Sequence, residues 1–393
     1  MRILMLAPHV FFQARGTPLS VYYRAKALGE LGHRVDVLTY HLGEPVDCKN
    51  VRIIRAPKVP LITTLKPGPS VKKIFLDAAM VARLTWQLLV RRYDIIYTHE
   101  EAALFGAVAR TTTGIPHVYD MHSSMPLQLK DWEFSDARWL RRIFDAMERF
   151  IIRNSDVVVP ICKNLEDIAR RIAPRAAIVT VENTAVLADE PAPDRRRAQQ
   201  LRQTLGLAGK NVILYTGTFL KIQGLDLLLE CVPTVIKACP QAMFVLVGGS
   251  ENEIRLLRTT CARLGIERNV LLLPQYPQDD MPSFYALADI LVSPRQIGIN
   301  APLKLFSYLN AAKPVVMTDL PIHRQIVQEP DAILVEPAPA AWSKTLVILL
   351  KDARLRTETG ERGRALVARR YSYAQYKQRI DMAVTRARAA TSR

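Results

Sequence analysis

The stretch Asn211–Leu229, NVILYTGTFLKIQGLDLLL, has the pattern of a buried strand, a glycine loop and a helix. Val212–Tyr215 is an apolar run of strand length, and Gly217 lies just beyond it. Gly224 then precedes leucines at helical spacing. A loop from a strand end to a helix N-terminus aims free backbone N–H groups at one point, which favours an anion. A purely structural loop has the same pattern, so this stretch alone leaves both interpretations open.

The bulk composition is that of a soluble globular protein, with 49% hydrophobic and 23% charged residues. A chain of 393 residues exceeds one ordinary core, so two domains are expected. The net charge of +17 suits a polyanion, an anionic membrane surface or a phosphate-bearing substrate. Nucleic acid is disfavoured, because the sequence has no Lys/Arg tail, zinc-ligand spacing or aromatic–basic recognition motif.

The cysteines and the N-terminal residues point to a cytoplasmic location. The cysteines form no CxxC motif and no pairing pattern, which is typical of free thiols in a reducing compartment. The start, MRILMLAPHVFF, predicts a first strand rather than a signal peptide, since it has one basic residue and contains Pro8 and His9. No run of 18 apolar residues occurs, so no transmembrane helix is expected. The five cysteines are Cys48, Cys162, Cys231, Cys239 and Cys261.

Strand-length apolar runs alternate with helical patterns in both halves of the chain, which predicts two parallel sheets covered on both faces. Ala185–Arg197 interrupts the alternation with prolines and charge. We therefore predict a first domain over 1–186, a linker over 187–200, a second domain over 201–370 and a helix over 371–393 that packs back on the first domain. The predicted strands are Ile3–Ala7, Val35–Thr39, Val51–Ile54, Asp94–Tyr97, His117–Asp120 and Val157–Pro160, then Val212–Tyr215, Met243–Val247, Val270–Leu273, Ile290–Val292, Val315–Met317 and Ile333–Val335.

Three loops of the second half follow strands and are expected to converge, because ligands bind at the carboxyl ends of parallel strands. In the third loop Arg295 leaves a strand end, and Lys304 falls near the first turn of a helix. A cation there opposes the helix dipole unless an anion lies nearby. The alternatives are a solvated helix face for Lys304 and a surface ion pair for Arg295. The three loops are Gly217–Gly224 with Lys221, Gly248-Gly249-Ser250, and Ser293–Tyr308.

The first half has candidate polar groups at its own strand ends. His122, in YDMHSSM, follows a strand and suits a hydrogen-bond or acid–base role, although a structural histidine fits equally. In His99-Glu100-Glu101, one carboxylate suits a base, or else the two are an acidic pair at a helix N-terminus. Gly16-Thr17 would bring backbone close to a ligand. The seven histidines lack metal-ligand spacing, so neither a metal nor a cofactor is expected.

Taken together, these motifs resemble the family 4 glycosyltransferases over nearly the whole chain. The resemblance rests on GTPLSVYYRAKALGELGHRVDVLTY, YDMHSS, YTGTFLKIQGLDLLL, FVLVGGS, ALADILVSP and YLNAAKPVVMTD, in that order and spacing. It implies the GT-B fold, two facing Rossmann-like domains with the nucleotide sugar bound mainly by the second. It also implies retaining, metal-independent transfer without a protein nucleophile.

The chain departs from the family pattern at four positions. Thr218 and Gln223 stand where the family has an arginine and a lysine on the donor diphosphate. Ile299 and Ser307 stand where the family has two glutamates. Lys221, Arg295 or Lys304 would then be the candidates to neutralise the diphosphate. The donor-binding residues implied by the resemblance are Gly217, Thr218, Lys221, Gln223, Gly224, Gly248, Gly249, Gln275, Tyr276, Asn300, Pro302, Leu305 and Ser307, with His122, Lys304 and Arg295 as catalytic residues.

The implied function is hexosyl transfer from a nucleotide-diphosphate sugar to a glycan or lipid-linked acceptor of cell-surface polysaccharide or glycolipid synthesis. Gly16, Thr17 and Glu101 would lie on the acceptor side. The helical patterns Lys72–Arg92 and Ala137–Asn154, with the basic excess, favour attachment to the anionic inner face of the plasma membrane. Ordinary core faces are the alternative for both helices. A nucleotide-sugar 2-epimerase and a non-catalytic scaffold of the same fold remain competing functions.

Overall fold

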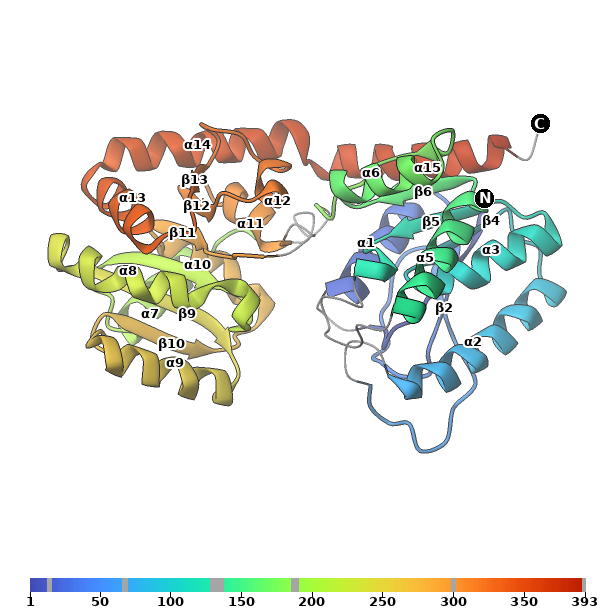
Figure 1. The fold of residues 1–393 in the computed structure, drawn as a ribbon, viewed down its shortest axis with the longest axis horizontal. Helices are drawn as coiled ribbons and strands as arrows, with labels where there is room; N and C mark the ends of the chain where they lie inside the picture. The colour runs from blue at the N-terminus through green and yellow to red at the C-terminus, as the bar shows by residue number, and fades with distance from the viewer. Residues whose placement is uncertain (13–15, 66–69, 128–137, 185–190, 298–301, 391–393) are drawn as a thin grey trace. The chain divides into compact units, whose positions relative to one another are not determined.

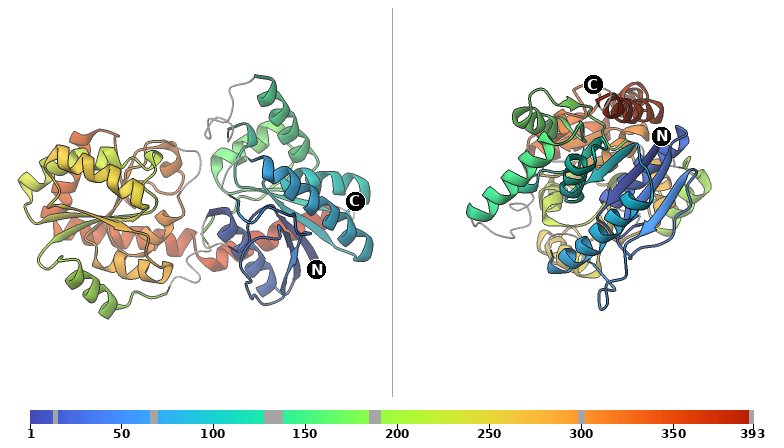
Figure 2. Two further views of the ribbon diagram at one scale, coloured as in Figure 1. Left: turned by 90° about the horizontal axis from the view of Figure 1, so that it is seen from below. Right: turned by 90° about the vertical axis from the view of Figure 1, so that its right-hand side faces the viewer.

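The computed structural model describes residues 1–12, 16–65, 70–127, 138–184, 191–297 and 302–390 (Figure 1). The chain forms two compact units. Unit 1 comprises residues 1–185 with 373–393, and unit 2 comprises residues 186–372. Each unit is a parallel sheet layered with helices, which confirms the predicted α/β class with two Rossmann-like domains (Figure 2).

Unit 1 is built on a seven-stranded sheet of order β3-β2-β1-β4-β5-β6-β7, in which every pair is parallel. Its strands are β1 (Arg2–Ala7), β2 (Arg34–Thr39), β3 (Val51–Arg55), β4 (Ile95–His99), β5 (His117–Met121), β6 (Val157–Pro160) and β7 (Ala177–Ile178). Its helices are α1 (Gly16–Glu30), α2 (Val71–Val90), α3 (Ala102–Thr113), α5 (Arg138–Arg153), α6 (Lys163–Ile172) and α15 (Tyr373–Ala390).

The C-terminal helix α15 is part of unit 1, although it follows unit 2 in the sequence. It packs against α1, β5 and β6. Ile380 and Val384 are completely buried there. Ion pairs join Lys377 to Glu30, 3.2 Å apart, and Arg379 to Glu182. The last helix therefore completes the core of the first unit.

Unit 2 is built on a six-stranded parallel sheet of order β10-β9-β8-β11-β12-β13. Its strands are β8 (Asn211–Thr216), β9 (Ala242–Gly249), β10 (Val270–Pro274), β11 (Ile290–Ser293), β12 (Val315–Thr318) and β13 (Ile333–Val335). Its helices are α7 (Arg195–Thr204), α8 (Leu225–Ala238), α9 (Glu251–Leu264), α10 (Met281–Leu287), α11 (Lys304–Asn310), α12 (Pro321–Arg324), α13 (Pro339–Lys351) and α14 (Ala353–Arg370). Short 3₁₀ turns cover Lys221–Gln223 and Gln278–Asp280.

Both faces of the unit 2 sheet are covered, as the apolar runs predicted. Ile213 and Tyr215 of β8 join one buried cluster, whereas Val212 and Leu214 join another. Successive side chains of a strand point to opposite faces, so the two clusters are the two cores of one sheet. The exposed edge at the carboxyl ends of the strands is therefore the place for a ligand. All the predicted strands overlap observed ones, and among the strands of the described residues only the two-residue β7 was not predicted.

The linker predicted over 187–200 is too long at its C-terminal end. Helix α7 begins at Arg195, because the Asp194 carboxylate accepts hydrogen bonds from the backbone N–H groups of Arg196 and Arg197 and so caps the helix. The Arg197 side chain also forms a bidentate ion pair with Asp280. In the described ranges, no helix has the length and apolar content needed to cross a bilayer.

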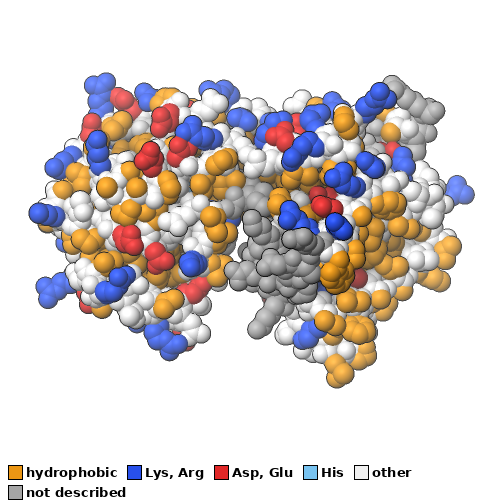
Figure 3. Space-filling model, in the orientation of Figure 1, with side chains coloured by type: hydrophobic (Ala, Val, Ile, Leu, Met, Phe, Trp, Pro, Cys, Tyr) orange, Lys and Arg blue, Asp and Glu red, His pale blue; other side chains and the backbone are white. Residues whose placement is uncertain are grey.

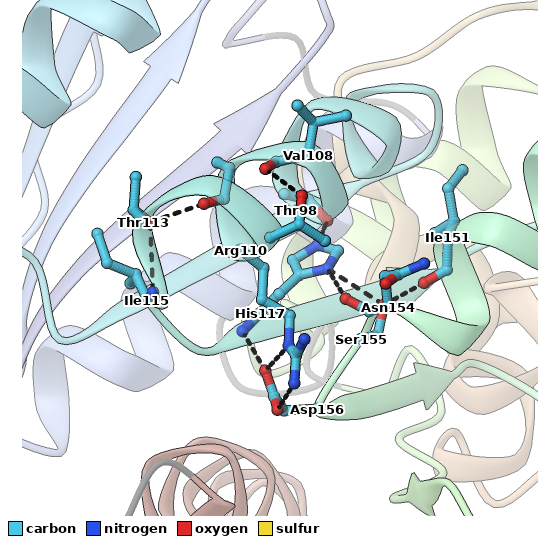
Figure 4. A network of polar contacts seen from close by, with 12 residues as sticks. Thr98, Val108, Arg110, Thr113, Ile115, His117, Ile151, Asn154, Ser155 and Asp156 are labelled. Carbon is cyan, nitrogen blue, oxygen red and sulfur yellow. Dashed lines mark hydrogen bonds and ion pairs between the residues drawn. The ribbon is translucent and has the colours of Figure 1, made fainter.

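His117 at the start of β5 belongs to a polar network that is structural (Figure 4). Its Nε2 lies 2.6 Å from Thr98 Oγ1, and its Nδ1 lies 3.1 Å from Ser155 Oγ. Asp156 accepts from the His117 backbone N–H and from both donor arms of Arg110. Burial lowers the pKa of His117 to about 4, so the ring stays neutral. This histidine ties α3, β4 and β5 together and has no open position for a ligand.

We expect Gly106→Ala in α3 to destabilise unit 1. An added Cβ would lie 2.4 Å from Thr98 Cγ2 and 2.5 Å from His117 Nε2. Overpacking of this kind costs about 1–3 kcal/mol, which exceeds the gain of about 1 kcal/mol in helix propensity. Urea unfolding should show the loss, whereas the exposed Thr111→Ala should stay within about 0.5 kcal/mol of the parent. Equal stabilities of the two variants would contradict this packing.

Candidate functional site

The loop after β8 is held in a fixed shape at the carboxyl edge of the unit 2 sheet. Gly217 has a φ of 134°, a conformation that side chains rarely adopt, and its N–H donates to Val247 O at 2.8 Å. The Tyr215 hydroxyl donates to Thr218 O at 2.7 Å. Gly217 and Thr218 themselves are exposed. The loop therefore presents backbone to solvent directly above the strand end.

Lys304, the first residue of α11, reaches this same strand end. Its Nζ donates to Thr216 O at 2.9 Å and lies 3.7 Å from the centroid of the Tyr215 ring. A Cβ on Gly217 would lie 3.3 Å from that Nζ. Burial of the amine, with the nearby charge of Arg295, holds the pKa of Lys304 well below its usual range. Within the described residues no carboxylate pairs with Lys304, so the amine is placed as if to meet an anion.

Buried polar atoms without partners lie at this edge of the sheet or in elements next to it. Ser293 and Thr318 end β11 and β12, and His323 belongs to α12. Burial, with the charges of Arg295 and Lys304, lowers the pKa of His323 to about 4. Since buried polar groups are nearly always paired, unpaired ones here indicate a ligand or bound water. The atoms without a partner among the described residues are Gln223 Oε1, Ser293 Oγ, Thr318 Oγ1 and His323 Nε2.

Three of the predicted donor-binding glycines have a packing reason to be glycine. A Cβ on Gly224 would lie 2.0 Å from Pro294 O, and one on Gly248 would lie 2.6 Å from Gly217 O. A Cβ on Gly249 would meet the Phe219 ring at 2.4 Å. These glycines let the three loops approach one another closely. Their assignment to donor binding stays a prediction.

The N-terminus of α9, after Gly248-Gly249, is closed by its own side chains. Ser250 and Glu253 form a capping box, in which the Ser250 N–H donates to Glu253 Oε2 at 2.8 Å. Glu251 adds a second carboxylate to the first turn. This helix end therefore does not attract an anion, unlike the strand end at Gly217.

The remaining predicted donor residues differ in accessibility. Leu305 and Ser307 are buried in α11, and Leu305 N–H donates to Pro302 O at 3.1 Å. Arg295 Nε donates to Ile297 O at 2.7 Å. Lys221 and Gln275 are exposed, while Tyr276 packs edge-on against Phe284. Asn300 lies outside the described residues. The structure thus brings the Lys304 amine next to Gly217, whereas the side chain of Lys221 is exposed to solvent.

In unit 1, His122 belongs to a buried cluster at the ends of β4 and β5. Its Nε2 lies 3.3 Å from His99 Nδ1 and 3.2 Å from Asp120 Oδ1. His99 Nδ1 lies 3.6 Å from Asp120 Oδ2. Burial holds the pKa of His99 well below its usual range. The carboxylate of Asp120 is therefore placed to orient the imidazole of His122.

Asp120 is itself held by Arg24 and Tyr97, two residues that the sequence did not indicate as part of a site. Arg24 Nε of α1 donates to Asp120 Oδ2 at 2.7 Å, and the Tyr97 hydroxyl donates to the same oxygen at 2.9 Å. Both side chains of the ion pair are completely buried. Burial would raise the pKa of Asp120, but the Arg24 guanidinium holds it below its usual range. Arg24 also contacts α15, with its guanidinium carbon 4.9 Å from the Tyr376 ring centroid.

His99, Asp120 and His122 can also be tested as a metal site, which sequence spacing could not reveal. One ligand atom of each lies within 4.8 Å of the other two. However, Asp120 already has a buried cation at 2.7 Å in Arg24. A divalent ion bound to Asp120 would lie beside that guanidinium at a cost in repulsion. The arrangement fits an oriented histidine better than a metal centre.

Two adjacent carboxyl groups beside this cluster are driven apart in pKa. Glu100 has a φ of 46°, a strained backbone of the kind found at functional sites, and accepts from Thr17 Oγ1 at 3.0 Å. Burial opposes its charge, but the neighbouring His9 and Lys73 lower its pKa. Burial raises the pKa of Glu101 to about 7, although Lys73 donates to it. Two neighbouring carboxyl groups with pKa values shifted in opposite directions are typical of acid–base pairs.

Glu101 should make the stability of unit 1 depend on pH. Its pKa rises from 4.5 in the unfolded chain to about 7 in the folded one. The folded state therefore binds this proton more tightly, so the contribution to stability is complete below about pH 4.5 and lost as pH rises through about 7. In urea unfolding over this range, Glu101→Gln should remove that decline, whereas the exposed Glu361→Gln should keep it. An unchanged slope in Glu101→Gln would exclude this coupling.

Comparison with known sequences covers both units. The glycosyl transferase 4-like domain matches residues 15–184, and the glycosyl transferases group 1 domain matches residues 210–352. The chain belongs to the family 4 glycosyltransferases. The family resemblance drawn from the sequence motifs is therefore confirmed.

Named relatives of this glycosyltransferase are distant in sequence. It is 26% identical over 385 residues to D-inositol 3-phosphate glycosyltransferase of Corynebacterium urealyticum, covering 90% of this chain and 88% of that protein. It is 24% identical over 298 residues to sulfoquinovosyl transferase SQD2 of Arabidopsis thaliana, covering 75% of this chain and 54% of that protein. The chain thus spans about half of the plant relative.

Solved structures share the fold over the full length of the glycosyltransferase. Sucrose-phosphate synthase from Thermosynechococcus elongatus superposes with a TM-score of 0.78 at 19% identity, covering 99% of each chain. The Anabaena protein HepE, in complex with UDP, gives a TM-score of 0.76 at 17% identity, covering 98% of this chain and 100% of that one. The predicted GT-B fold is confirmed.

Proposed function

We propose that this glycosyltransferase moves a hexose from a nucleotide-diphosphate sugar to a glycan or lipid-linked acceptor, with retention of configuration. The observation that carries the donor assignment is the Lys304 amine above Tyr215 and beside Gly217, without a described carboxylate partner. The unpaired Gln223, Ser293 and Thr318 support it. Structures of HepE with UDP and with UDP-glucose support a nucleotide-sugar donor for the shared fold.

The departing diphosphate would be stabilised mainly by side-chain cations. The N-terminus of α8 at Gly224 contributes only about 0.3–2 kcal/mol as a dipole, and Asp226 in its first turn works against an anion. Lys304 has a lowered pKa in the free protein, and a bound diphosphate would raise that pKa and charge the amine. Arg295 would add a second cation. In this proposal the transfer needs no metal, no cofactor and no protein nucleophile.

His122 would serve the transferred sugar as a hydrogen-bonding group. Its Nε2 is held by His99 and Asp120, and the Asp120 charge is fixed by Arg24. A ring oriented in this way keeps one geometry toward a hydroxyl without reorganising during the reaction. Thr17 of α1, with Glu100 and Glu101 after β4, would face the acceptor hydroxyl.

The acceptor class rests on the relatives and on charge. One relative is a phosphatidylinositol monomannoside mannosyltransferase of Mycolicibacterium smegmatis, 24% identical over 127 residues. With the net charge of +17, this supports an anionic or lipid-linked acceptor at the inner face of the plasma membrane, in cell-surface polysaccharide or glycolipid synthesis.

Two other functions give different outcomes in one experiment. The protein is incubated with UDP-, GDP- or ADP-sugars, with and without a lipid extract, and the products are followed by NMR. Transfer predicts nucleoside diphosphate release that depends on acceptor, with the anomeric configuration kept. A 2-epimerase would convert the donor sugar without acceptor, and a non-catalytic scaffold would leave every donor unchanged. Either of these results, or an inverted product, would contradict the proposal.

A further inference from the structure

Helix α2 of unit 1 buries Leu76, Met80 and Leu84 in the core, turns several polar side chains inward beside them, and leaves other apolar side chains exposed. Lys73 pairs with Glu101, and Asp77 accepts from the Tyr40 hydroxyl at 2.5 Å. Gln87 is buried and accepts from the Tyr93 hydroxyl at 3.1 Å. These inward contacts make the polar groups of the helix part of unit 1. Its inner face is thus an ordinary core face, whereas the outer face of an ordinary surface helix is polar.

The outward face of α2 is a continuous apolar stripe. Leu89 is 78% exposed, Val71 is 72% exposed and Ile74 is 66% exposed. Lys72 is the one charged residue among the exposed positions of this helix. The helix has 20 residues, so the stripe is about 30 Å long. The exposed positions, at intervals of one to four residues, are Val71, Lys72, Ile74, Phe75, Ala78, Ala82, Thr85, Trp86, Leu89 and Val90.

Single exposed apolar residues are normal, but a contiguous stripe marks an interaction surface. Figure 3 shows hydrophobic side chains gathered over α2. Before α2 in the sequence, Leu61 is a further exposed apolar residue, with 96% exposure and a φ of 66°. The alternative of an ordinary core face accounts for the buried Leu76, Met80 and Leu84, but not for the exposed apolar side chains of the outer face.

The charge around the stripe indicates what covers it. Lys58 precedes Leu61, Lys72 begins the helix, and Arg92 follows its C-terminus, and all three are exposed. Unit 1 as a whole has 31 Lys and Arg against 19 Asp and Glu, which is +12 of the total +17. Lysine and arginine beside an apolar stripe complement the headgroups of anionic lipids.

We propose that the outer face of α2, with Leu61, inserts into the interface of an anionic lipid bilayer and lies along its plane. A second copy of this chain fits the surface less well, because the stripe has cations at both ends and no exposed acid within α2. Pairing two such helices in either direction would place cation against cation. Attachment by this face would bring the enzyme to a lipid-linked acceptor in the bilayer, and in this respect the proposal rests on the proposed function.

The test is flotation of the full chain with vesicles, without donor or acceptor, so its outcome is independent of catalysis. We expect binding to vesicles of phosphatidylcholine with phosphatidylglycerol, weaker binding at high salt, and little binding to phosphatidylcholine alone. Replacing Trp86 and Leu89 together by serine should lower the partition coefficient at least tenfold. The matched control is Leu256→Ser in α9 of unit 2, another exposed leucine, which should bind as the parent does.

Two results would overturn the proposal. One is a parent protein that does not float with anionic vesicles at low salt, or an α2 variant that floats as well as the parent. The other is a stable dimer in sedimentation velocity without lipid that the Trp86→Ser/Leu89→Ser change dissociates, since that would assign the stripe to a second copy. Circular dichroism of the variant checks that α2 remains folded.

Discussion

Replacement of Lys304 by methionine should lower kcat/KM for sugar transfer by about 100- to 1,000-fold, the range seen when one preorganised group on a developing anion is removed. The reason is the position of the amine, 2.9 Å from Thr216 O at the end of β8 and next to Gly217. Methionine keeps the length of the side chain but supplies no charge to the leaving diphosphate. Steady-state assays of donor consumption with a saturating acceptor measure the effect.

The exposed Lys221 is the matched control for this change. It is the other lysine of the glycine loop region, and Lys221→Met should change kcat/KM by less than about threefold because it is solvated. Lys304→Met should change the melting temperature only slightly, since the cost of burying the amine offsets its hydrogen bond to Thr216 O and its contact with the Tyr215 ring. An active Lys304→Met enzyme, or a larger loss in Lys221→Met, would refute the assignment.

Replacement of Arg24 by methionine should destabilise unit 1 by about 3–5 kcal/mol, because it leaves a buried carboxylate without its cation. Arg24 also donates to Val181 O at 2.8 Å, which ties α1 to the segment after β7. Urea unfolding followed by circular dichroism measures the change. The destabilisation should grow with pH above the usual pKa of an aspartate, since the Asp120 charge is what the variant leaves uncompensated.

Two further variants separate the charge effect from packing. Adding Asp120→Asn to Arg24→Met should recover part of the lost stability, because the buried charge is gone. Arg110→Met breaks the more exposed pair with Asp156 and should cost about 1 kcal/mol or less. If Arg24→Met lowers the free energy of unfolding no more than Arg110→Met does, the buried Arg24–Asp120 pair does not stabilise unit 1 as its burial indicates.

The strands and the glycine loop could be predicted because their signals are local. Val212–Tyr215 is apolar at every position, and a parallel strand buried on both faces requires this. Gly217 was predicted as a turn and has a φ of 134°. Lys304 was singled out from its unfavourable place in a helix, and the structure brings it to that glycine.

The anchors of the site could not be predicted, because they depend on contacts distant in sequence. Arg24 and Asp120 are 96 residues apart in the sequence. The local sequence around each one predicts only an ordinary helix residue or strand-end residue. Gly248 and Gly249 were predicted from the sequence as donor-binding residues, and the structure adds a packing reason for both, since an added Cβ would meet Gly217 or Phe219. The apolar pattern of α2 could not show which side faces water, since both of its faces carry apolar residues.

The central claim is that the strand-end loops of unit 2 bind a nucleoside diphosphate through Lys304. Isothermal titration calorimetry with UDP, GDP and ADP tests this directly. We predict that one of the three binds the parent protein at a single site and that Lys304→Met weakens this binding about 100-fold or more, while Lys221→Met does not. Absence of binding for all three nucleotides, or equal binding by the parent and Lys304→Met, would contradict the account.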